Sequence, residues 1–114
     1  MRKHPAIGTV VLVHFPFTDL SGEKRRPAIV LAHAEGNDLI VACVSSRMQR
    51  SSSYSVVIDP EDADFAQTGL REKSIICVDK LVTLDSSVLS GELGLLSKEI
   101  QVRVGEKLKN LFNL

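Results

Sequence analysis

Two adjacent arginines, Arg25 and Arg26, stand between a polar loop and an apolar stretch that begins at Pro27. A guanidinium group is permanently charged and presents a rigid fork of hydrogen-bond donors, which suits it to phosphate oxygens. At such a junction the backbone stops being mobile, so a cation can be held at the rim of a core. This placement makes nucleic acid the first ligand to consider.

A second polar group follows another apolar stretch, where Ser45, Ser46 and Arg47 come directly after residues 39–44. Hydroxyl groups can hold phosphate oxygens or ribose hydroxyls, and arginine stabilises the extra charge of a phosphorane. If this group faces Arg26, it suits an attack on RNA by its own 2′-hydroxyl, which needs no metal ion and no protein nucleophile. The simpler alternative is that the serines end a strand and Arg47 is solvated.

A single carboxylate, Asp79, follows the apolar residues 75–78. At the end of a buried strand it could orient an arginine or accept a proton, and it could equally pair with a lysine or cap a turn. The sequence contains no serine-hydrolase elbow, no HExxH pair and no P-loop. These motif-based enzyme classes are therefore excluded.

The cysteines and histidines give no sign of a metal centre. Cys43 and Cys77 each lie inside an apolar run, so we expect two buried, reduced thiols without the close histidine partners of a zinc site. His4, His14 and His33 are isolated in the sequence, and structural roles are expected for them. No cofactor is predicted.

Composition predicts one small β-rich domain. The 114 residues suffice for a single core, and the core must be built mainly from Val, Ile and Leu because aromatic residues make up only 4%. The net charge is zero, which excludes a general nucleic-acid coat and leaves a local basic patch. The start of the chain lacks the apolar stretch of a signal peptide and no run is long enough to span a membrane, so a cytoplasmic protein is expected.

Short apolar runs bounded by turn residues predict about five antiparallel strands that close into a small barrel. A loop with one helical turn is expected at 61–70. The strands are expected at Thr9–Phe15, Pro27–His33, Leu39–Ser45, Tyr54–Ile58 and Ser74–Val78, with Lys80–Leu84 continuing the last one past a kink.

The period of the apolar residues changes near the C-terminus, where a helix is predicted. Ser97 suits its N-cap, and Glu99 suits the positive end of the helix dipole. The apolar face consists of Ile100, Val104, Leu108 and Leu111, with Phe112 beside them.

These segments together resemble the PemK/MazF family of toxins from bacterial toxin–antitoxin pairs. The motifs that carry the resemblance are GTVVLVHFPF, RRPAIVLA, VACVSSR, TGL followed by SIICVDKLVTLD, and the C-terminal helix. Their order and spacing fit from Gly8 to about Leu114. The resemblance implies a mainly β fold, a small SH3-like antiparallel barrel with a C-terminal helix, in a single domain over residues 1–114.

The resemblance also implies an activity and partners. Many members cleave single-stranded RNA without a metal ion, leaving a 2′,3′-cyclic phosphate and a 5′-hydroxyl. Members usually form homodimers, and a cognate antitoxin blocks the RNA groove with an extended segment. The chain is therefore expected to be a metal-independent, sequence-specific endoribonuclease that acts on messenger RNA and pairs with an antitoxin.

Carried over by position, the family's catalytic arginine falls on Arg26, which would stabilise the scissile phosphate and could protonate the leaving oxygen. The strand-end hydroxyl falls on Ser45, which would hold the phosphate or position the 2′-hydroxyl. In the Kid/PemK branch an aspartate also takes part, and it falls on Asp79. RNA contacts are expected from Phe17, Lys24, Arg25, Ser46 and Arg47.

Two departures from the Kid/PemK branch matter. Its second catalytic arginine falls on Cys77, which carries no positive charge, and the histidine of its first loop has no counterpart between Pro16 and Lys24. Arg26 would therefore supply most of the positive charge, helped by Arg47. The alternatives are a barrel that binds RNA and an antitoxin without cutting, and a toxin of the same fold that acts on a protein such as gyrase.

Overall fold

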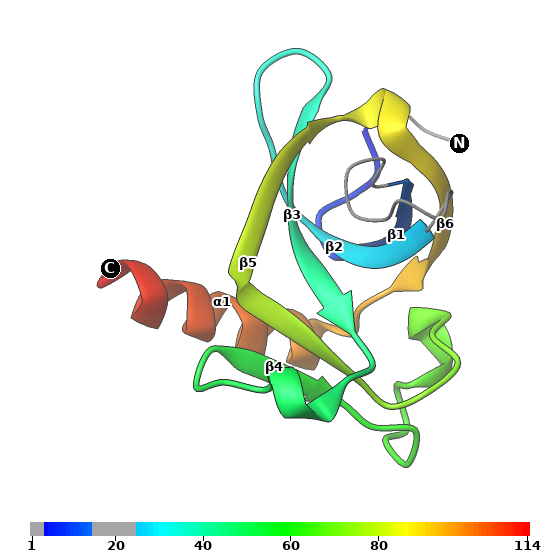
Figure 1. Cartoon of the computed structure of the whole chain (residues 1–114), viewed down its shortest axis with the longest axis vertical. Helices are drawn as coiled ribbons and strands as arrows, with labels where there is room; N and C mark the ends of the chain where they lie inside the picture. The colour runs from blue at the N-terminus through cyan, green and yellow to red at the C-terminus, as the bar shows by residue number, and fades with distance from the viewer. Residues whose placement is uncertain (1–3, 15–24) are drawn as a thin grey trace.

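The computed structural model describes residues 4–14 and 25–114, and antiparallel strands are the main regular structure in this part of the chain (Figure 1). Short 3-10 turns connect several of them: η1 (Met48–Arg50), η2 (Ala66–Thr68) and η3 (Ser86–Val88). The strands are β1 (Thr9–His14), β2 (Arg25–His33), β3 (Asp38–Ser45), β4 (Ser55–Ile58), β5 (Ser74–Asp85) and β6 (Leu89–Leu95), and the helix α1 spans Lys98–Phe112.

The six strands form one sheet in the order β4-β5-β3-β2-β1-β6. The expected mainly β class with a C-terminal helix is confirmed. The sheet curls so that β5, η3 and β6 arch around β1 and β2 (Figure 1). In the part of the chain that the structure describes, β4 and β6 are the free edges, so the curled sheet is not closed by pairing as the expected barrel would be.

Apolar side chains cover both faces of the sheet, because β-branched runs in β1 to β5 leave few polar positions. On one face α1 packs over a cluster to which it contributes Ile100 and Val104. The opposite, concave face carries a second cluster, formed by Val11, Val13, Ala28, Val30, Leu39, Val41 and Leu89. The two clusters pack against opposite faces of the sheet and so fix the positions of the polar residues at its strand ends.

Strand β5 bends sharply in its middle (Figure 1). In the pairing of β3 with β5, Ala42 lies opposite Leu81, but the next residue, Cys43, lies opposite Cys77. Residues 78–80 therefore have no partners in β3. The predicted kink between two strand segments is this bend, although the structure keeps both halves in one strand.

The helix α1 begins where the sequence predicts. The Ser97 hydroxyl caps it by accepting a hydrogen bond from the Ile100 amide at 3.2 Å. Asn113 ends it in the left-handed conformation, with φ of 58°. Phe112, which was expected beside the apolar face, is 55% exposed.

The other boundaries differ little from those expected, with two exceptions. Strand β2 begins at Arg25 rather than at Pro27, which places both arginines on the sheet. Strand β6 was not predicted, because its sequence LSGELGL has two glycines and is half exposed. No helix in the described residues is long and apolar enough to cross a membrane.

Candidate active site

An open hollow of about 520 Å³ lies where three segments meet: the start of β2, the end of β3 and the loop between η2 and β5. Its walls mix apolar strand residues with four arginines. The lining residues are Leu12, Arg25, Arg26, Pro27, Val44, Ser45, Ser46, Arg47, Gly69, Leu70, Arg71, Glu72, Ser74 and Leu93. The two polar groups singled out from the sequence thus line one hollow.

Arg26 and Ser45 come together because β2 pairs with β3. Ala28 lies opposite Cys43 in this pair, and two residues further along the two strands stand Arg26 and Ser45. Side chains two residues apart on a strand share a face. Both residues are half-buried, so the sheet restricts their side chains, and both line the hollow.

The Ser45 hydroxyl is oriented by the turn that follows β3. Its oxygen accepts a hydrogen bond from the backbone amide of Arg47 at 3.1 Å. A hydroxyl that accepts one bond still has a proton to donate. Ser46 and Arg47 are exposed at the rim of the same hollow.

The third wall of the hollow is a loop anchored against β6 by direct backbone contact. Gly69 has φ of +74°, and a β-carbon there would lie 2.0 Å from the Leu93 carbonyl oxygen. Thr68 is fully buried, and its hydroxyl donates to the Phe65 carbonyl and accepts from the Leu70 amide. This is the physical reason for the TGL motif, which fixes the backbone just before Arg71.

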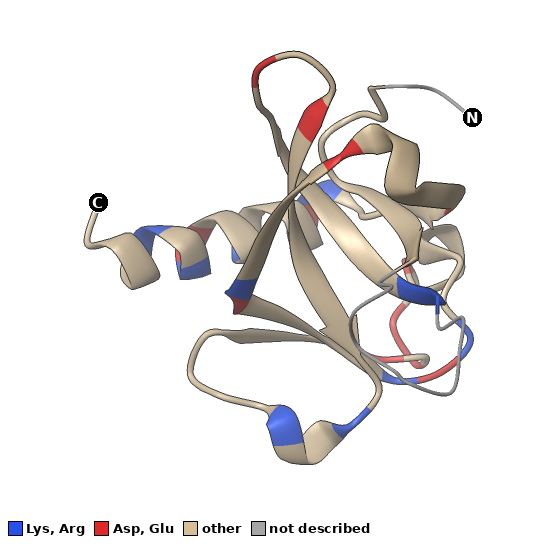
Figure 2. Ribbon diagram, turned by 45° about the horizontal axis from the view of Figure 1, so that its top comes forward, with Lys and Arg blue, Asp and Glu red and all other residues tan. Residues whose placement is uncertain are grey.

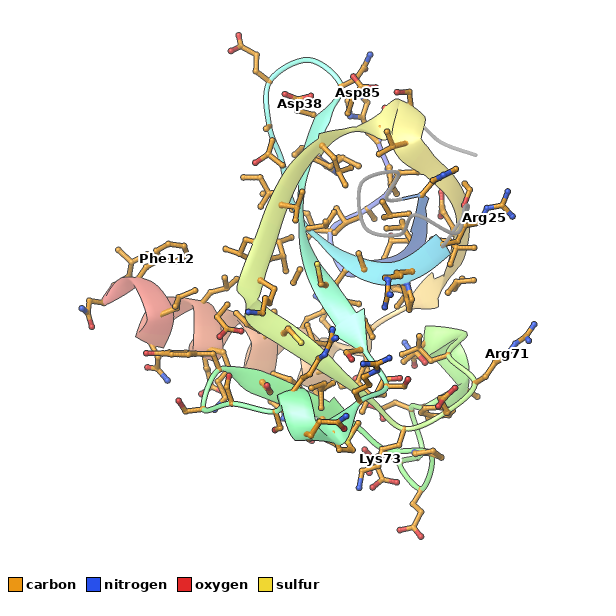
Figure 3. All side chains as sticks on the ribbon, in the orientation of Figure 1. Arg25, Asp38, Arg71, Lys73, Asp85 and Phe112 are labelled. Atoms are coloured by element: carbon orange, nitrogen blue, oxygen red, sulfur yellow. The ribbon has the colours of Figure 1, made fainter. Side chains whose placement is uncertain are left out.

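Arg71 and Glu72 are the charged lining residues that sequence reasoning missed. The positive charge of Arg71 could be noticed in the sequence, but nothing in the sequence placed Arg71 near Arg26. Arg25 and Arg71 extend outward on the same side of the molecule (Figure 3). The ribbon coloured by charge shows basic segments on that side at the start of β2 and in the loop before β5 (Figure 2).

The structure does not bring Asp79 to the hollow. It is exposed, lies in the unpaired bend of β5, and is absent from the lining residues. Phe17 and Lys24, which were expected to contact RNA, lie outside the described residues. Among residues 4–14 and 25–114, no cluster of three or more metal-ligating side chains occurs.

The positive charge of Arg26 also reaches the concave face of the sheet. Burial raises the pKa of the Cys43 thiol above its ordinary value, while Lys80 and Arg26 act in the opposite direction. An arginine can act in this way only when its guanidinium is near the thiol. Arg26 therefore lines the hollow and also lies near Cys43, which faces Ala28, two residues along β2.

Comparison with known proteins identifies a family model that matches the chain and solved structures that share its fold. The model of a family described as PemK-like, MazF-like toxin of type II toxin–antitoxin systems matches residues 6–112. A search of curated protein sequences finds no match.

Several solved structures share the fold. The Mycobacterium tuberculosis toxin MazF-mt6 is 20% identical, with a TM-score of 0.72 over 93% of this chain and 97% of that one. A MazE–MazF complex from Deinococcus radiodurans is 23% identical, with a TM-score of 0.72 over 96% of each chain. An endoribonuclease bound to its cognate antitoxin from a mycobacterial species is 19% identical, with a TM-score of 0.71 over 97% of each chain.

Proposed function

Since the chain belongs to the PemK-like, MazF-like toxin family of type II toxin–antitoxin systems, we propose that it is the toxin of such a pair and acts as an endoribonuclease. The observation that carries the proposal is that Arg26 and Ser45 line one hollow with three further arginines. In a chain with no net charge, four guanidinium groups around one hollow favour a polyanion at that site. Single-stranded RNA, which many members of the family are expected to cleave, is a polyanion that fits this site.

In the proposed reaction the 2′-oxygen of the RNA attacks the adjacent phosphorus, and the bond to the 5′-oxygen of the next nucleotide breaks. The products are a 2′,3′-cyclic phosphate and a 5′-hydroxyl. Arg26 binds the non-bridging oxygens, whose negative charge increases in the transition state. Its half-buried position supports this role, because a charge-assisted hydrogen bond is stronger where water is partly excluded.

Ser45 holds the same phosphate or the attacking ribose hydroxyl through its own hydroxyl group. The hydrogen bond from the Arg47 amide fixes the Ser45 oxygen before substrate arrives, so little reorganisation is needed. Arg25, Ser46, Arg47 and Arg71 contact the phosphates and sugars of neighbouring nucleotides. No proton transfer is assigned to Asp79.

We further propose a cytoplasmic homodimer that is inhibited by an antitoxin. The antitoxin would place an extended acidic segment in the hollow and so compete with RNA for the four arginines. Two of the structural neighbours are complexes of a toxin with its antitoxin, which supports a partner of this kind.

The test is cleavage of a long single-stranded RNA by the purified protein in the presence of EDTA, with sequencing of the new 5′ ends. Arg26→Ala should reduce cleavage by about 100-fold or more while the thermal unfolding midpoint changes little. Arg103→Ala is the matched control, because Arg103 is an exposed arginine on α1 outside the hollow. Undiminished cleavage by Arg26→Ala would show that the assignment of the active site is wrong.

Two observations favour the second candidate, a barrel that binds RNA without cutting it. Cys77 supplies no charge where the Kid/PemK branch has an arginine, and Asp79 does not line the hollow. The two candidates differ in one readout. A protein that retards RNA in a gel and leaves every sequence intact is a binding module, whereas new 5′-hydroxyl ends identify a nuclease.

A further inference from the structure

The two cysteines of the chain lie directly opposite each other on neighbouring strands. Cys43 of β3 pairs with Cys77 of β5, immediately beside the bend that interrupts this pair of strands. Both are free thiols. The proposed RNA reaction uses neither of them, so they need a separate explanation.

The spacing of opposite residues in antiparallel strands suits a disulfide bond. Their Cα atoms are separated by roughly 4.5 or 5.5 Å, according to the type of pair. Disulfides join residues whose Cα atoms are about 4.4 to 6.8 Å apart. The usual separation of opposite residues such as Cys43 and Cys77 thus falls within the range that a disulfide bond spans.

The two thiols differ in access and in the charges around them. Cys43 is half-buried, whereas Cys77 is only 5% exposed. Burial raises the pKa of both thiols. At Cys43 the positive charges of Lys80 and Arg26 oppose this rise in pKa. At Cys77 the neighbouring Asp79 and Cys43 raise the pKa further, whereas Lys80 and Arg50 oppose the rise. Cys43 is the more accessible of the two thiols, so an oxidant from solution reaches it more readily than it reaches Cys77.

We propose that Cys43 and Cys77 are an oxidisable thiol pair, which hydrogen peroxide converts into an intramolecular disulfide between β3 and β5. Cys43 is the attacking residue and Cys77 is the resolving residue. The pair is a modification site on the face of the sheet that also carries Arg26 and Ser45, but its chemistry uses none of the proposed RNA-binding side chains. Its existence does not depend on whether the protein cleaves RNA.

The chemistry proceeds in two steps. The Cys43 thiolate attacks one oxygen of the peroxide, the O–O bond breaks, and the sulfur becomes a sulfenic acid while one water is released. The Cys77 thiolate then attacks the Cys43 sulfur, the S–O bond breaks, and a second water leaves as the S–S bond forms. The peroxide is reduced to two waters, which take up the two thiol protons, and the two sulfurs are oxidised together by two electrons.

The test uses the full-length reduced protein, hydrogen peroxide at mildly alkaline pH, and intact mass after alkylation. We expect the loss of two hydrogen atoms, no alkylation of either cysteine, and recovery of both thiols with dithiothreitol. Trypsin should release residues 26–47 linked to residues 74–80. Two thiols that still alkylate after treatment, or a cross-link that forms only between two chains, would overturn the proposal.

Single variants separate the two roles. In Cys77→Ser, peroxide should leave a sulfenic acid on Cys43 that dimedone traps. In Cys43→Ser, Cys77 should remain largely unmodified under the same conditions, because it is almost inaccessible. Equal reactivity of the two single variants would contradict the assigned order. The wild-type peptide map decides the main question even if one variant fails to fold.

Discussion

Gly69 lies so close to Leu93 that a β-carbon on Gly69 would stand 2.0 Å from the Leu93 carbonyl oxygen. The contact is reciprocal, since a β-carbon on Gly94 would lie 2.2 Å from the carbonyl oxygen of Gln67. Two glycines thus allow the loop before β5 and the edge strand β6 to touch through their backbones. This contact fixes the wall of the hollow that carries Arg71.

Replacing this glycine should disturb both stability and the site. Gly69→Ala adds strain from the positive φ and forces two backbones apart, so we expect a loss of about 2 kcal/mol or more in the free energy of unfolding. Gly36→Ala is the control, because Gly36 also has a positive φ, of +66°, but nothing lies within 4 Å of its β position. It should lose only about 1 kcal/mol. Equal losses in urea titrations would contradict the close packing.

Arg71 should contribute to RNA affinity through a phosphate. Each phosphate contact with single-stranded nucleic acid contributes about 0.7 to the slope of log affinity against log salt. Arg71→Ala should lower that slope by about this amount, measured on an RNA whose 2′-hydroxyl at the cleavage site is replaced by hydrogen. Arg103→Ala should leave it unchanged. An unaltered slope in Arg71→Ala would remove Arg71 from the interface.

Ser45 should matter for its hydroxyl rather than for its size. Ser45→Ala removes the group that accepts the Arg47 amide and contacts the substrate, so cleavage should fall by roughly 10- to 100-fold. Ser45→Thr keeps the hydroxyl and should retain most of the activity. Ser46→Ala, at the exposed rim, should have a smaller effect. If Ser46→Ala proves the more damaging variant, the roles of the two serines are exchanged.

The sequence predicts those strands whose own side chains form a continuous apolar run. β1 to β5 contain continuous runs of Val, Ile and Leu, which leave little choice but a buried strand. β6 has no such run, and its place is set by Gly94, whose lack of a side chain matters only once the loop before β5 lies against it. An isolated glycine in a strand is a sign of close backbone approach, yet the sequence does not say which backbone approaches.

The site was predictable to the same extent. Arg26 and Ser45 could be placed together because each adjoins an apolar strand and the two strands follow one another in a hairpin. Arg71 could not, since its position depends on a loop packed against the edge strand. The pairing of Cys43 with Cys77 depends on the bend of β5, where the partner jumps from Leu81 to Cys77. A shift of this kind in the pairing of two strands does not change the alternation of apolar and polar residues, so the sequence does not reveal it.

The Cys43 thiol offers a chemical measure of where the Arg26 guanidinium lies. Only the thiolate is alkylated, and burial raises the pKa of Cys43 above its ordinary value of 9.0, so iodoacetamide should react slowly at neutral pH and faster as the pH rises past 9.0. Arg26 opposes this rise in pKa. Removing its charge in Arg26→Ala should therefore raise the pKa further and slow alkylation at any fixed pH below it.

Arg26→Lys keeps a positive charge near Cys43, so its alkylation rate should stay close to that of the wild type, and Arg103→Ala should not change the rate at all. The rate is best followed by the mass of the peptide 26–47, whose size changes predictably with each substitution at position 26. The measurement requires no RNA, so it tests the placement of Arg26 separately from its catalytic role. If Arg26→Ala and wild type react equally fast at every pH, the guanidinium does not lie beside Cys43, and the arrangement of the hollow around Arg26 must be revised.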